Sequence, residues 1–136
     1  MVFGGAAAPA QQAAFTRPVG NLSGQQITGE TASAGLACAP ISTDLTGRVA
    51  IVERGVCSFE AKVRNAMTAG AVAVIVYNSA PFGDQLIVMS GMTQVEIPAV
   101  FVGRSTGLAL LAGSPMQVTI SSCSRSASCR GQLSLD

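Results

Sequence analysis

The chain contains no histidine and no tryptophan, and it has a single tyrosine. The lack of histidine excludes a Ser-His-Asp or Cys-His catalytic set and any metal site that uses histidine ligands. Charged residues make up only 11% of the 136 residues, whereas about 25% is usual for soluble domains. Any catalysis would therefore depend on Asp, Glu, Lys, Cys or Tyr.

The composition also argues against strongly charged binding partners. The net charge is +1, no long basic stripe is present, and aromatic residues make up 4% of the chain. Nucleic acids and anionic membranes are therefore not expected as partners. Two uncharged runs, 65–83 and 105–124, are almost long enough to span a bilayer, but Gly, Pro, Asn, Ser and Thr interrupt them. We expect buried elements and turns there, and no membrane span in this chain.

What the chain does contain is one apolar domain with four cysteines, namely Cys38, Cys57, Cys123 and Cys129. None forms a CxxC pair, so zinc is not expected, and an even count favours two disulfides in an oxidising compartment. Of the three possible pairings we favour Cys38–Cys57 and Cys123–Cys129, because the second pair is close in sequence. Free, buried cysteines in a cytosolic protein remain the alternative.

Acidic residues show no metal-binding pattern either. Asp44, Glu53, Asp84 and Glu96 are scattered, without the clustered carboxylates of a calcium loop. We predict no metal site and no cofactor.

The most informative stretch lies between Arg48 and Tyr77. Arg48–Glu53 is an apolar run typical of a strand covered on both faces. Ser58 is a suitable N-cap for a helix that ends at Gly70, and Val72–Tyr77 is a second buried strand. A helical crossover of this length predicts a parallel, right-handed βαβ unit.

Weaker patterns predict four further elements. These are a strand over 25–32, a third buried strand over 97–102, a short helix capped by Ser105 that ends at Gly113, and a closing strand over 116–120. Residues 86–92 are ambiguous.

The motifs of this stretch and of the strand at 97–102 resemble those of the protease-associated domain. The matching segments are Arg54-Gly-Val-Cys-Ser-Phe59, Lys62, Asn65-Ala66, Ala69-Gly-Ala71, Asn78 and Ile97-Pro-Ala-Val100. The resemblance covers about Gly24 to Ile120. We therefore expect a leader over 1–23, the domain over 24–122, and a cysteine-containing tail over 123–136, which the family motif does not explain.

The resemblance implies a mixed α/β fold, with a curved mixed sheet or open β-barrel flanked by two helices. It also implies that the domain is not an enzyme. Such domains accompany secreted subtilisin-like peptidases and zinc aminopeptidases, and they occur in sorting receptors and membrane-bound ubiquitin ligases. Cys38 and Cys57 fit positions that are bridged in many members of the family.

Six residues are candidates for partner contacts, from their loop positions and from the resemblance: Arg54, Gly55, Val56, Ser58, Asn78 and Phe82. Each also has a structural interpretation. Gly55 suits a sharp turn, Arg54 could bond a nearby carbonyl or carboxylate, and Asn78 could form a turn. Ser58 and Lys62 superficially resemble a Ser-Lys dyad, but capping uses the same hydroxyl. We expect Lys62 to lay its stem over the core and keep its ammonium group in water.

The resemblance implies a non-catalytic module that binds a protein or peptide, or that regulates substrate access beside a neighbouring peptidase catalytic domain, and the lack of histidine agrees with the absence of catalysis. The alternatives are a ligand-capturing module of a sorting receptor or cell-surface protein, an independent hydrolase, and a spacer that binds nothing. The cysteines favour a secreted or extracytoplasmic location. Arginine outnumbers lysine seven to one, which suggests a GC-rich bacterial genome.

Overall fold

The structure is a computed structural model that describes residues 2–3, 6–12, 26–85, 97, 99–121 and 132–135. Five strands form a curled mixed sheet in the order β6-β5-β4-β3-β7. Their bounds are β3 Gln26–Ser33, β4 Arg48–Glu53, β5 Ala73–Tyr77, β6 Ala99–Val102 and β7 Gln117–Ser121. Together with the helices α1 (Phe59–Thr68) and α2 (Arg104–Gly113), this sheet confirms the fold class expected from the sequence.

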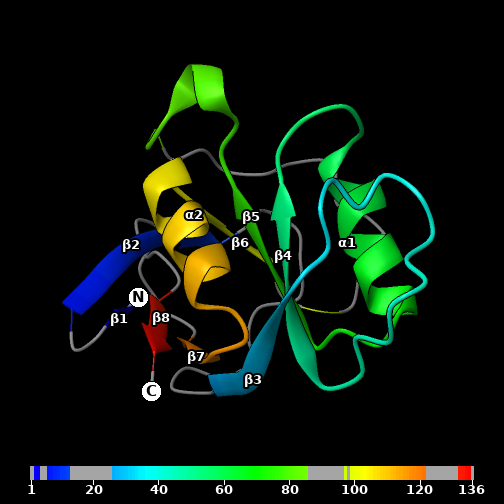
Figure 1. Cartoon of the computed structure of the whole chain (residues 1–136), viewed down its shortest axis with the longest axis horizontal. Coiled ribbons are helices and arrows are strands. Elements are labelled where there is room, and N and C mark those ends of the chain that lie inside the picture. Colours follow the sequence, from blue (N-terminus) through cyan, green and yellow to red (C-terminus); the bar gives the residue numbers. More distant parts are fainter. Residues whose placement is uncertain are drawn as a thin grey trace.

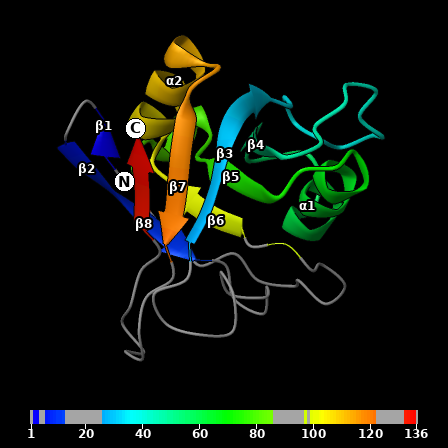
Figure 2. The ribbon, with the colours of Figure 1, turned by 90° about the horizontal axis from the view of Figure 1, so that it is seen from below.

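Three strands near the termini extend this sheet: β1 (Val2–Phe3), β2 (Ala6–Gln12) and β8 (Gln132–Leu135). β2 pairs with β6, β8 pairs with β7, and β2 and β8 also pair with each other. This last pairing joins the two edges of the curled sheet (Figure 2). β2 lies within the expected leader and β8 within the expected tail. The boundaries at residues 23 and 122 remain predictions.

The strands β3, β4, β5 and β6 are parallel to one another, whereas β7 runs antiparallel to β3 and β2 runs antiparallel to β6. The expected strand-helix-strand unit is therefore present, with β4 and β5 in parallel register from Val49 opposite Ala73. Parallel strands bring their carboxyl ends to one edge of the sheet. The loops after β4 and β5 both leave this edge, at the top of Figure 1.

The two helices cover opposite faces of the sheet (Figure 1). Alternate strand residues point to opposite faces, so β4 and β5 contribute to two separate cores. On one side Val52 and Val76 pack with Val63 of α1, and on the other Ile51 and Ile75 pack with Leu110 of α2. This double coverage explains why β4 and β5 are apolar almost throughout.

The start of α2 differs from the prediction that Ser105 caps it. The helix begins at Arg104 with Gly103 in the N-cap position. The carboxylate of Asp84 accepts a hydrogen bond from the backbone N–H of Ser105 at 2.7 Å and another from its hydroxyl at 2.8 Å. A loop carboxylate therefore caps this helix, and the hydroxyl of Ser105 donates instead of accepting.

The favoured Cys123–Cys129 pair and the ambiguous segment 86–92 lie outside the described residues.

Candidate functional site

The turn that follows β4 presents an apolar side chain on a constrained backbone. Gly55 has a φ of 120° and Val56 a φ of 73°, and the backbone N–H of Cys57 donates to the carbonyl oxygen of Gly55 at 2.9 Å. Positive φ is a genuine outlier for a β-branched residue. The side chain of Val56 is 88% exposed. The turn therefore places an apolar group in water at a conformational cost.

A disulfide fixes this turn to the loop that follows β3. Cys57 is bonded to Cys38, with 5.7 Å between their Cα atoms, so the first favoured pairing is confirmed. The loop around Cys38 is also tied to α1, because the side-chain amide of Asn65 donates to the carbonyl oxygen of Ala37 at 2.9 Å. The two loops at the sheet edge thus form one cross-linked unit.

Arg54 brings three of the predicted site residues together. Its Nη1 donates to Oδ1 of Asn78 at 3.0 Å, and its guanidinium carbon lies 4.4 Å from the centre of the Phe82 ring. Asn78 is fully buried and also donates to the carbonyl oxygen of Gln85 at 2.8 Å. Phe82 ends the short 3-10 helix η1 (Ala80–Phe82) and is 49% exposed. Asn78 therefore positions Arg54, and Arg54 in turn supports the exposed ring.

Arg104, the first residue of α2 and two residues after the end of β6, belongs to the same edge and was missed in the sequence. Its Nη1 donates to Oε2 of Glu53 at 3.0 Å and to the carbonyl oxygen of Asn78 at 3.2 Å. Its guanidinium carbon lies 5.9 Å from the centre of the Tyr77 ring, and burial raises the pKa of that tyrosine. The available indication was position, since Arg104 follows a buried strand just as Arg54 does.

Ser58 and Lys62 do not form a catalytic pair. The Ser58 hydroxyl accepts a hydrogen bond from the backbone N–H of Ala61 at 3.1 Å, which confirms its role as the cap of α1. Lys62 is fully buried, and its Nζ donates to the carbonyl oxygen of Leu36 at 2.7 Å. The expectation of a water-exposed ammonium group was therefore wrong. Burial lowers the pKa of Lys62, while the charge of Glu53 acts in the opposite direction.

Exposed apolar side chains occur in three successive loops at this edge. Leu36 follows β3, Val56 follows β4 and Phe82 follows β5, with exposures of 38%, 88% and 49%. The disulfide links the first two loops, and the stacking of Arg54 on Phe82 links the last two. This group of three residues, together with Arg54, is called the edge cluster below.

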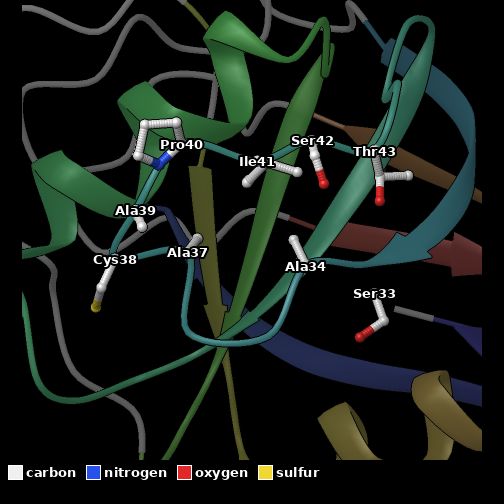
Figure 3. A pocket seen from close by; sticks show the side chains of 9 residues that line it. All are labelled: Ser33, Ala34, Ala37, Cys38, Ala39, Pro40, Ile41, Ser42 and Thr43. Atoms are coloured by element: carbon white, nitrogen blue, oxygen red, sulfur yellow. The ribbon is translucent and has the colours of Figure 1, made fainter.

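An open pocket of about 400 Å³ lies in the loop after β3. Its lining consists of small, apolar or hydroxyl side chains, labelled in Figure 3: Ser33, Ala34, Ala37, Cys38, Ala39, Pro40, Ile41, Ser42 and Thr43. None of these side chains is charged, and the pocket alone assigns no chemistry.

In the described part of the chain, no three acidic or cysteine side chains gather where they could bind a metal ion. Neither helix described there has the length and apolar character needed to cross a membrane.

Comparison with known proteins agrees with this architecture. Residues 5–110 match the PA domain. Over 64 residues the chain is 53% identical to the E3 ubiquitin-protein ligase Godzilla of Drosophila melanogaster, a match that covers 46% of this chain and 12% of the ligase. Over 76 residues it is 37% identical to the C5a peptidase of Streptococcus pyogenes serotype M3, covering 56% of this chain and 6% of the peptidase. BSAP, a zinc aminopeptidase from Bacillus subtilis, has a similar structure, with a TM-score of 0.66 and 26% identity over 95% of this chain and 28% of that chain.

The chain is therefore a PA (protease-associated) domain. Domains of this family are found in peptidases and also in ubiquitin ligases and receptors. The chain spans only a small fraction of each relative named above, so those similarities concern one domain of larger proteins.

Proposed function

We propose that this PA domain is a non-catalytic module of a larger extracytoplasmic peptidase, in which it binds a protein or peptide or regulates the access of substrate. The contact surface is the edge cluster. The observation that carries the proposal is the support of the exposed Phe82 ring by Arg54, which precedes the constrained and exposed Val56 by two residues in the same turn.

The chemistry of the edge cluster suits an extended peptide or a protein loop. Exposed apolar side chains recover free energy when a partner covers them, and arginine and aromatic residues are over-represented among the residues that dominate binding energy. The disulfide and the Asn78 hydrogen bonds fix the loops before binding, so little ordering is required of this side of the interface. The partner would be a protein or peptide ligand, or a neighbouring peptidase catalytic domain.

A catalytic role for the domain itself receives no support from the site. Among the described side chains, the hydroxyl of Ser58 is used as a helix cap and Lys62 contacts the loop after β3. A nucleophile needs an adjacent base, and this pair does not provide one. The extracytoplasmic location is supported by the disulfide, since disulfides persist in oxidising compartments.

A second candidate function is capture of a ligand by a receptor or cell-surface protein. It is favoured by the high identity to a ubiquitin ligase, which shows that this type of sequence also occurs outside peptidases. The same edge cluster would serve both functions, and the sequence of the parent protein would distinguish them.

Selection of a random peptide library against the immobilised domain tests the binding role. The selected peptides are then measured by fluorescence polarisation against Arg54→Ala, Val56→Ser and Phe82→Ala. The matched controls are Arg64→Ala, an exposed arginine on α1, and Leu108→Ala, an exposed leucine on α2. We expect the three site variants to weaken binding about tenfold or more, and the controls to leave it unchanged.

Two results would contradict the proposal. One is binding that depends equally on the control residues, and the other is turnover in a broad peptidase and esterase screen that disappears in Ser58→Ala.

A further inference from the structure

The chain has a single lysine, and the structure buries it against a disulfide. Lys62 has no exposed surface, and its Nζ lies 3.6 Å from Sγ of Cys38. Among the residues that the structure describes, no carboxylate lies within ion-pair distance of Lys62. This is unusual for a buried lysine, because burial of a charge is costly unless it is paired. Within the described part of the chain, its ammonium group contacts the carbonyl oxygen of Leu36 and this sulfur.

The two sulfurs of the disulfide therefore differ in their surroundings. Cys38 follows the buried Ala37 and contacts the cation, whereas Cys57 lies between the exposed residues Val56 and Ser58 in the surface turn. In thiol–disulfide exchange, the thiolate that is better stabilised leaves faster, and the nucleophile attacks the other sulfur. We propose that the Cys38–Cys57 disulfide is a modification site for directional thiol exchange, at which an incoming thiolate attacks Cys57 and Cys38 leaves as a thiolate beside Lys62.

The step uses an external thiol or dithiol. A bond forms between its sulfur and Sγ of Cys57 while the bond between Cys57 and Cys38 breaks, and the electron pair of that bond stays on Sγ of Cys38. A second thiol of the reductant then attacks the reductant's sulfur in the mixed disulfide. The bond from that sulfur to Sγ of Cys57 breaks, Cys57 leaves as a thiolate, the reductant is released as a disulfide, and the two cysteine thiolates take up the protons that the reductant's thiols gave up. The protein gains two electrons and two protons, and the dithiol loses the same number.

The amino end of α1 lies next to Cys57 and would stabilise a thiolate there, which would favour the opposite direction of exchange. A helix terminus carries about half a positive charge, whereas the lysine carries a full one and touches the sulfur directly. Glu60 in the first turn further reduces the positive potential near Cys57. The carbonyl oxygens of Leu36 and Gly55 lie 3.6 and 3.8 Å from Sγ of Cys38 and oppose a thiolate there, but they carry only partial charges. The full charge of Lys62 decides the direction.

The loop that carries Cys38 has contacts that do not depend on the disulfide. Lys62 binds the carbonyl oxygen of Leu36, and Asn65 binds that of Ala37. After exchange, these two hydrogen bonds would keep Sγ of Cys38 close to Lys62. This inference does not depend on the proposed binding function.

The test measures where glutathione attaches in the unmodified protein. The protein is treated briefly with glutathione, quenched with acid, alkylated with N-ethylmaleimide and digested with trypsin, which separates the peptide 55–62 with Cys57 from the peptide that ends at Arg48 with Cys38. We expect at least about fivefold more glutathione on Cys57 than on Cys38. Equal amounts, or more on Cys38, would overturn the proposal.

Variants identify the cause of the bias. Lys62→Met should reduce the preference to about twofold or less, and Lys62→Arg should retain it. Asn65→Leu is the matched control, because it removes the other hydrogen bond to the loop without changing the charge beside Cys38, and its preference should stay at the wild-type value.

If Lys62→Met does not fold, the reduced wild-type protein gives the same answer. Its Cys38 should be alkylated by iodoacetamide at lower pH than its Cys57. The opposite order would overturn the proposal.

Discussion

The guanidinium carbon of Arg54 lies 4.4 Å from the centre of the Phe82 ring, so a cation from the loop after β4 stacks on an aromatic side chain from the loop after β5. Arg54 also donates to the buried Asn78, which fixes the direction of its guanidinium group. The position of Phe82 at the surface therefore depends on a residue in another loop. The stacking of Arg54 on Phe82 joins the two loops of the edge cluster, and its coupling energy can be measured.

A double-mutant cycle over Arg54 and Phe82 should give a coupling energy of about 0.5 to 1 kcal/mol, the range for cation–π pairs at exposed sites. The variants are Arg54→Ala, Phe82→Ala and the double substitution, and the measurement is urea unfolding. The control cycle combines Arg64→Ala with Phe82→Ala. Arg64 pairs with Glu60 on α1, so this cycle should give no coupling energy. Equal coupling in the two cycles would show that the stacking does not join the loops.

Loss of the Cys38–Cys57 disulfide should destabilise the domain substantially. The two cysteines are 19 residues apart, and in the chain-entropy model a loop of this size contributes about 3 kcal/mol. Cys38→Ser with Cys57→Ser should lower the free energy of unfolding by about this amount, measured by urea unfolding. Asn65→Leu offers a comparison, because it weakens the same loop by a single hydrogen bond and should cost about 1 kcal/mol. A loss of similar size in the two variants would contradict the entropic account.

Much of the fold could be predicted because its patterns are local. The strand at Arg48–Glu53 was placed at its observed bounds, and the Ser58 cap follows from the residue type and its position before an apolar stripe. The parallel orientation of β4 and β5 follows from the length of the crossover. Arg54, Asn78 and Phe82 were candidates because of their loop positions and the resemblance, and they lie together because residues that follow parallel strands meet at one edge.

The features that were missed depend on contacts between distant segments. Asp84 caps α2 from a loop 21 residues earlier, so Ser105 was the only local candidate. The buried ammonium group of Lys62 donates to the carbonyl oxygen of Leu36. This acceptor lies 26 residues upstream in a loop without periodicity, so the burial of Lys62 could not be predicted. The sequence shows that a lysine flanks an apolar stripe, but it does not show what covers the end of its side chain.

The Asp84 cap predicts a defined dependence of stability on pH. Hydrogen bonds from the backbone and hydroxyl of Ser105 lower the pKa of Asp84 below its usual 3.8. A carboxyl group whose pKa is lower in the folded state stabilises the fold above its unfolded pKa and loses this contribution as the pH falls through the folded value. Asp84→Asn should therefore be less stable than the wild type at about pH 7, and the difference should shrink below about pH 4.

Urea midpoints measured between about pH 2.5 and pH 7 would check this dependence. Ser105→Ala removes one of the two hydrogen bonds and should give an intermediate profile. A difference between Asp84→Asn and the wild type that is constant with pH would contradict the capping role.

Val56 offers a way to separate binding from stability. A β-branched residue at a φ of 73° is strained by roughly 1 to 2 kcal/mol, whereas glycine adopts this conformation freely. Glycine also adds about 0.5 to 1 kcal/mol of entropy to the unfolded chain, so the net effect of Val56→Gly should lie between zero and a gain of about 1.5 kcal/mol. The side chain is 88% exposed, and its removal costs little packing. We expect Val56→Gly to unfold at the same urea concentration as the wild type or a higher one, yet to bind the selected peptides more weakly.

Val49→Ala is the opposite control, because it truncates a fully buried residue of β4 and should lower stability without touching the edge cluster. A domain that tolerates strain at an exposed apolar side chain, and gains stability when that side chain is removed, retains it for contact; a clear loss of stability in Val56→Gly would instead assign the residue to the fold.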